Sequence, residues 1–137
     1  MAGLRVSIGV AGHQEMVKRL REMKNRMAAR HLMKSVMPGA EIVRDAAAAN
    51  APRRQGAPRK AGHLADNIVI KVQKRGKSQA IVLVGPSADH FWGHFLEFGT
   101  AKMPAQPWLR PALENNLNAV AGAVRFELRS RLLEAIR

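Results

Sequence analysis

Residues 90–112, HFWGHFLEFGTAKMPAQPWLRPA, constrain the fold of this chain more than any other segment. Both tryptophans, three of the four phenylalanines and three of the seven prolines lie within them. Aromatic side chains bury large areas and supply many of the anchors of cores and interfaces. Prolines fix φ and remove backbone donors. We therefore interpret this segment as a rigid connection that serves structure and assembly rather than catalysis.

The first part of the chain predicts a strand followed by a long helical segment. Apolar and polar residues alternate over residues 4–10, which is typical of a half-buried strand. From about residue 13 the apolar residues recur at helical spacing. We expect a kink or a break at Pro38-Gly39, then helix again up to Asn50, because Pro52 disfavours helix at the residue before it.

The second half predicts a hairpin and two further helices. Alternation over 67–74, a turn at 75–78 and a second strand over 79–85 with an apolar run at 80–84 indicate a β-hairpin, closed by Pro86. A short helix is expected over 90–98, capped by Ser87 and ended by Gly99. A stripe of apolar residues predicts one last helix over 108–137. It contains Leu109, Leu113, Leu117, Val120, Val124, Leu128, Leu132 and Ile136.

These elements predict a single α+β domain over residues 1–137. The N-terminal strand and the hairpin form a small, mostly antiparallel sheet, packed against the long N-terminal helical segment and the long C-terminal helix. Residues 51–62, APRRQGAPRKAG, form a basic loop without a large apolar side chain. No apolar run approaches the roughly 20 residues of a membrane span, so no membrane partner is expected.

The aromatic residues of the 90–112 segment are expected to pack together. Helical spacing places Phe91, Phe95 and Phe98 on one face, and the proline bridge is short enough to return Trp108 to them. Arg110 can reach Glu97 or a carbonyl. Trp92 lies off that face, so we expect it to be more exposed and to contact another subunit.

Catalytic and cofactor sites are not indicated. His90 and His94 are four residues apart, but no glutamate lies between them to act as a base, and we interpret them as surface or interface histidines. The serines show no nucleophile elbow, and there is no phosphate-binding glycine motif. The chain has no cysteine for a disulfide or a thiolate metal site. We expect no enzyme activity, no metal and no cofactor.

Two motifs resemble a known family. Leu96 to Thr100 reads LEFGT and Pro104 to Ala112 reads PAQPWLRPA, and Ala51-Pro52 and Gly62-His63-Leu64 follow the long helix. This order resembles the small neck proteins, or head–tail joining and tail-completion proteins, of long-tailed bacteriophages and prophages. The chain departs from their pattern before Gly62, where Ala61 replaces the usual Thr or Ser. The candidate motif and packing residues are Phe91, Phe95, Glu97, Phe98, Gly99, Thr100, Pro104, Pro107, Trp108, Leu109, Arg110 and Pro111.

The resemblance implies a structural virion protein at the head–tail junction, assembled in the host cytoplasm. It implies a closed ring of identical subunits, which we expect to be six-fold, in contact with neighbouring neck adaptor and tail proteins. The neck adaptor and tail terminator roles are not separable from the sequence. The expected assembly or partner contacts are Arg53, Arg54, Arg59, Lys60 and Trp92.

The charge of the chain supports an alternative function. Its formal net charge is +13, and residues 51–77 contain eight basic residues against Asp66 alone. Such a patch attracts nucleic acid or acidic protein surfaces. A small basic nucleic-acid-binding protein is therefore the alternative, opposed by the lack of aromatic residues among these basic ones. In the neck protein, the same loop would meet an acidic neighbour or passing DNA.

Overall fold

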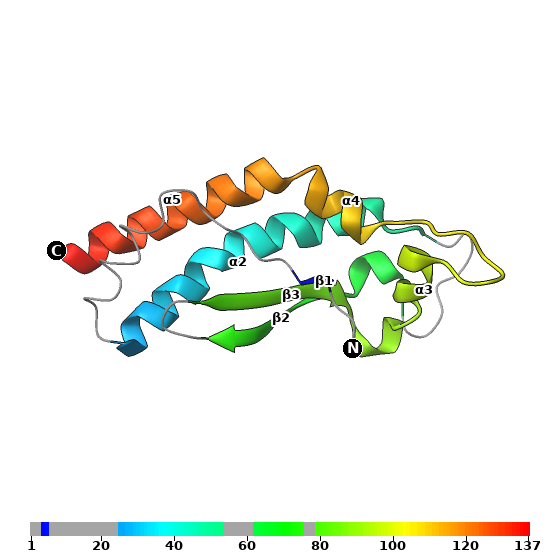
Figure 1. Cartoon of the computed structure of the whole chain (residues 1–137), viewed down its shortest axis with the longest axis horizontal. Coiled ribbons are helices and arrows are strands. Elements are labelled where there is room, and N and C mark those ends of the chain that lie inside the picture. The colour runs from blue at the N-terminus through cyan, green and yellow to red at the C-terminus, as the bar shows by residue number, and fades with distance from the viewer. Residues whose placement is uncertain (1–3, 6–24, 54–61, 76–78) are drawn as a thin grey trace.

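A computed structural model describes residues 4–5, 25–53, 62–75 and 79–137 of the chain. Helix α2 runs between a small sheet on one side and helix α5 on the other, so the fold has three layers (Figure 1). The predicted α+β class is confirmed. In chain order the elements are β1 (Leu4–Arg5), α2 (Asn25–Asn50), η1 (Leu64–Asp66), β2 (Ile68–Arg75), β3 (Ala80–Pro86), η2 (Ala88–His90), α3 (Gly93–Phe98), α4 (Leu109–Glu114) and α5 (Leu117–Ile136).

The sheet is antiparallel, with β3 between β1 and β2. The predicted hairpin is confirmed, and its register pairs Ile70 with Val84. On β3, Val82 and Val84 are buried, whereas their neighbours are half-buried. This alternation places one face of the strand against α2, as period-two patterning requires. Of the strand predicted over 4–10, Leu4 and Arg5 pair with β3, and the rest lies outside the described residues.

Of the kink or break predicted at Pro38-Gly39, the break is wrong, because helix α2 continues through Pro38. A proline inside a helix removes one backbone hydrogen bond and typically costs about 3 kcal/mol. Packing on both sides of α2 outweighs this cost, because Met33, Ala40, Val43 and Ala47 are all buried in the core. The predicted end at Asn50 is confirmed, and the start predicted near residue 13 lies outside the described residues.

Gly39 marks the close approach of α2 to α5. A Cβ at this position would lie 2.9 Å from Cγ2 of Val124 and 3.0 Å from Cγ1 of Val120. The Pro-Gly pair therefore serves helix packing here. Because Gly39 has no Cβ, α2 and α5 come closer at this point than a larger residue would allow. The sequence pattern of a helix breaker and that of a helix contact are the same at this position.

We expect Gly39→Ala to lower the melting temperature and Gly122→Ala to raise it. Alanine in a helix interior gains about 0.5–1 kcal/mol over glycine at both sites. Overpacking at Gly39 costs about 1–3 kcal/mol and exceeds that gain, whereas a Cβ on Gly122 would have no heavy atom within 4 Å. Thermal unfolding followed by circular dichroism measures both signs. A rise for both variants would contradict the tight contact at Gly39.

The single C-terminal helix predicted over 108–137 is instead two helices, α4 and α5. The separating residues are Asn115 and Asn116, and Asn116 Nδ2 donates to the carbonyl of Ala112 at 2.8 Å. Asparagine favours such local bonds over a continuous helix. The inner part of the predicted stripe is confirmed: Val120, Val124, Leu128 and Leu132 are buried. Its outlying members Leu117 and Ile136 are exposed. No helix in the described part of the chain is long and apolar enough to cross a membrane.

Candidate assembly surface on helix α3

The side chain of Glu97 holds the start of α4. It is buried at 7% exposure. Its Oε2 accepts the backbone N–H groups of Trp108 at 2.8 Å and Leu109 at 2.9 Å, and its Oε1 accepts that of Arg110 at 3.0 Å. The next residue, Pro111, has no N–H to satisfy. A helix start leaves four positions whose N–H has no partner within the helix. Here the carboxylate accepts at three of them, and Pro111 at the fourth has no N–H.

This arrangement explains the spacing of the two motifs. Arg110 meets Glu97 through its backbone N–H, and the residue itself is exposed. A carboxylate near a helix N-terminus is also favoured by the helix dipole. Glu97 was singled out from its motif, but its capping role was not predicted. A glutamate upstream of the sequence Trp-Leu-Arg-Pro is the signal from which it can be found.

Trp108 is the largest fully buried side chain in the described part of the core. Its indole Nε1 donates to the carbonyl of Gly93 at 3.0 Å. Gly93 leaves room for this contact, because a Cβ there would lie 3.1 Å from Leu64 Cδ1 and 3.4 Å from Trp108 Cζ2. The expectation that Trp108 packs in the core is confirmed. α3 and α4 are therefore joined through both the indole and the Glu97 carboxylate.

Gly99 ends α3, as predicted. The φ of Gly99 is +74°, and its N–H donates to the carbonyl of Phe95 at 2.8 Å. A Cβ on Gly99 would lie 2.8 Å from the backbone nitrogen of Ala105. Only glycine fits both the backbone conformation and the space. Thr100 and Met103 then form a short antiparallel bridge. Pro104 and Pro107 lie exposed in the connection, and Pro111 lies in the first turn of α4.

The predicted cluster of three phenylalanines around Trp108 is wrong. Phe91, Phe95 and Phe98 are 60%, 48% and 61% exposed, whereas Trp108 is 1% exposed. The rings of Phe91 and Phe95 contact each other edge to face, with centroids 6.2 Å apart. The inward face of α3 is instead formed by Gly93 and Glu97. These two residues bind Trp108 and the start of α4, so the phenylalanines face outward.

The exposure expected for Trp92 is also corrected. At 37% it is less exposed than any of the three phenylalanines. Its ring lies 5.8 Å from that of His90. Phe91, Trp92, Phe95 and Phe98 are all exposed within eight consecutive residues, and we call this group the α3 aromatic surface. Large exposed apolar patches of this kind mark interaction sites.

His90 is buried, contrary to the expectation of a surface or interface histidine. Its Nδ1 lies 2.9 Å from Ser87 Oγ, and its Nε2 lies 3.5 Å from the carbonyl oxygen of Gly62. Ser87 was predicted to cap one helix over 90–98. It precedes the short η2 helix instead, and its hydroxyl contacts the imidazole of His90, with no cap hydrogen bond to the backbone. Among the described residues, no group of three or more His, Cys, Asp or Glu side chains is arranged to hold a metal ion.

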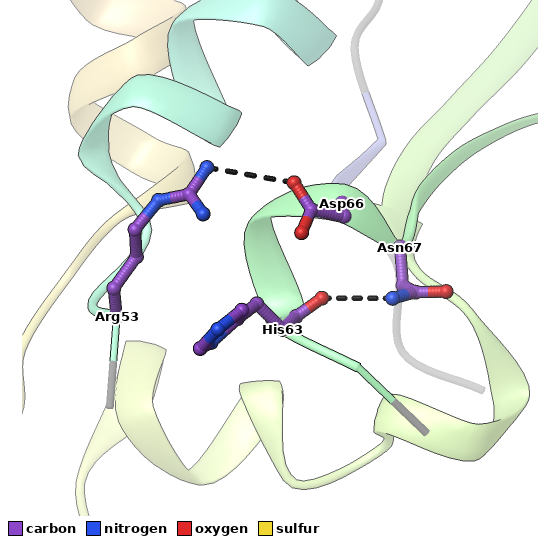
Figure 2. A network of polar contacts seen from close by, with 4 residues as sticks. All are labelled: Arg53, His63, Asp66 and Asn67. Carbon is purple, nitrogen blue, oxygen red and sulfur yellow. Dashed lines mark hydrogen bonds and ion pairs between the residues drawn. The ribbon is translucent and has the colours of Figure 1, made fainter. Parts of the chain in front are cut away.

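Arg53 is the one residue of the predicted basic contacts that lies in the described part of the chain. Figure 2 shows its guanidinium directed at Asp66 of η1, with Nη2 and Oδ1 3.4 Å apart. The side chains are both 59% exposed, so this ion pair contributes about 1 kcal/mol or less. In the same region Asn67 Nδ2 donates to the carbonyl of His63 at 2.8 Å. Arg54, Arg59 and Lys60 lie outside the described residues.

The fold and surface are those of a small α+β protein whose rigid α3–α4 junction presents aromatic side chains to solvent. Residues 14–99 match the model of a family described as "Bacteriophage HK97-gp10, putative tail-component". The chain belongs to this family of structural phage tail components. The match includes α2, the hairpin and α3, and it ends at Gly99. Searches of curated proteins and of solved structures gave no match.

Proposed function

We propose that this protein is a non-enzymatic structural protein of the phage neck, which joins or completes the tail end at the head–tail interface. It acts there as a ring of identical subunits, six-fold to match the tail, in contact with neighbouring neck and tail proteins. The observation that carries this proposal is the match of residues 14–99 to a tail-component family. The LEFGT and PAQPWLRPA motifs support the narrower neck role through their resemblance to neck proteins.

The structure supports an assembly function through the α3 aromatic surface. Four exposed aromatic residues lie on α3 and in the turn before it, and the inner face of α3 is fixed by Glu97 and Trp108. A surface held in one conformation before it binds loses less entropy on binding. Aromatic residues are also enriched among those that contribute most to interfaces.

The positive charge is assigned to the same role. Arg53 and the basic segment that follows it are proposed to meet an acidic neighbouring protein, with non-specific contact to DNA passing through the ring. A dedicated nucleic-acid-binding protein remains the rival, on the formal net charge of +13. The neck protein and the nucleic-acid-binding protein differ in how their DNA binding depends on salt. Binding through phosphate contacts weakens steeply as the salt concentration rises.

The test is to disrupt the gene in the phage or prophage that encodes it and to image the particles. We expect filled heads and tails that do not join, and joined particles again when the wild-type protein is supplied. An electron-microscopy map of wild-type virions should then place the chain as a ring at the head–tail junction. A single copy, or a position away from this junction, would overturn the proposal.

A further inference from the structure

Helix α5 has a second face that packing against α2 does not use. Phe126, Leu133 and Ile136 are 72%, 57% and 63% exposed. At 100° per residue they fall on one stripe about 100° wide, separate from the buried stripe of Val120 to Leu132. Exposed Gly122, Arg125 and Arg129 lie on it too. We call this stripe the α5 outer face, made of Gly122, Arg125, Phe126, Arg129, Leu133 and Ile136.

The α3 aromatic surface and the α5 outer face are complementary in charge. Residues 78–101 contain no lysine or arginine in a chain of net charge +13, and exposed Asp89 precedes the first of the aromatic residues, Phe91, by two positions. Within the described part of the chain, neither Asp89 nor Arg125 nor Arg129 forms an ion pair. Guanidinium groups bind both carboxylates and the faces of aromatic rings.

The two surfaces lie toward opposite ends of the molecule. In Figure 1, α3 is at one end of the longest axis, and the C-terminal half of α5 runs out to the other. One chain therefore cannot bring its own two surfaces together, whereas two copies placed end to end can. A contact between different faces of identical subunits repeats from copy to copy, and it closes into a ring if the rotation permits.

We propose that the α3 aromatic surface of one copy docks on the α5 outer face of the next copy. The aromatic rings of α3 pack against Phe126 and Leu133, and Arg125 and Arg129 face Asp89 and the ring faces. This inference rests on the homo-oligomer of the proposed function and specifies which faces form it. α5 lies outside the matched residues 14–99, so the contact rests on this chain's own surfaces and not on the family match.

Cysteine cross-linking of the full chain tests this pairing, because the wild-type sequence contains no cysteine. Phe98→Cys and Leu133→Cys each replace an exposed side chain, so both variants should fold. With a short bismaleimide linker, each single variant alone should stay largely monomeric, and an equal mixture should give a covalent dimer. The double variant should give a ladder of trimers and larger species, because each chain then offers both ends of the contact.

The control pairs Val72→Cys, an exposed site on β2, with Leu133→Cys, and should give no ladder above background. Arg129→Glu added to the double-cysteine chain should abolish the ladder. Lys71→Glu makes the same charge change at another exposed site and should leave the ladder intact. Dimers of Phe98→Cys alone would instead show α3 meeting α3. Such dimers, or a ladder no stronger than the control across the accessible concentration range, would overturn the pairing.

This experiment separates the contact from the neck role. A ladder from the isolated protein, together with virions that lack the chain at the head–tail junction, would support the contact and contradict the proposed function. A ring at the head–tail junction without a specific ladder would support the proposed function and contradict the contact between α3 and α5.

Discussion

Replacing Trp108 by alanine is expected to remove a large part of the stability of the fold and to threaten folding itself. Truncation of a buried tryptophan typically costs about 3–5 kcal/mol, and a domain of this size has about 5–15 kcal/mol in total. Trp108 is 1% exposed, and its indole also satisfies the carbonyl of Gly93. The loss therefore removes core packing and a bond between α4 and α3 together. Urea unfolding followed by far-ultraviolet circular dichroism measures the effect.

Trp92→Ala is the matched control for this substitution. Trp92 belongs to the same segment but is 37% exposed, so its removal should leave the monomer folded and weaken assembly. Trp108→Phe should lie between the two, because it keeps most of the buried area and loses the indole donor. Equal stability of Trp108→Ala and Trp92→Ala would contradict the placement of Trp108 at the centre of the core.

The fold was predictable wherever local pattern and tertiary packing agree. Alternation identified the hairpin, and Asn50 before Ala51-Pro52 identified the end of α2. At Pro38-Gly39 they disagree: local preference favours a break, and the contact of Gly39 with Val120 and Val124 favours a continuous helix. The sequence shows the first effect and not the second, because the second depends on residues more than 80 positions away.

The candidate site was predictable in its residues but not in its orientation. Helical spacing predicts one face for Phe91, Phe95 and Phe98, but spacing alone does not say which face turns inward. Hydrophobicity favoured burying the phenylalanines. The structure buries Gly93 and Glu97 instead, because the first admits the Trp108 indole and the second supplies acceptors to three backbone donors. The contacts of Gly93 and Glu97 with Trp108 and the start of α4 therefore decide which face of α3 is buried.

Glu97→Gln is expected to destabilise the protein by about 2–4 kcal/mol, although it changes one atom. A carboxylate offers two acceptor oxygens, and Glu97 uses both for the N–H groups of Trp108, Leu109 and Arg110. Glutamine keeps one oxygen and turns an NH₂ donor toward backbone donors. Each buried donor left without an acceptor costs about 1–3 kcal/mol. Chemical unfolding gives the total, and amide hydrogen exchange at residues 108–110 shows where it arises.

Glu114→Gln makes the same chemical change at the exposed end of α4 and should leave stability nearly unchanged. A matching result for the two variants would show that Glu97 does not hold the start of α4. The role of Glu97 at the start of α4 also affects assembly. α3 and α4 have six residues each, and helices this short are not stable alone in water. Because Glu97 and Trp108 tie them together, Glu97→Gln should also loosen the α3 aromatic surface. It should therefore weaken subunit contacts even at temperatures where most of the protein remains folded.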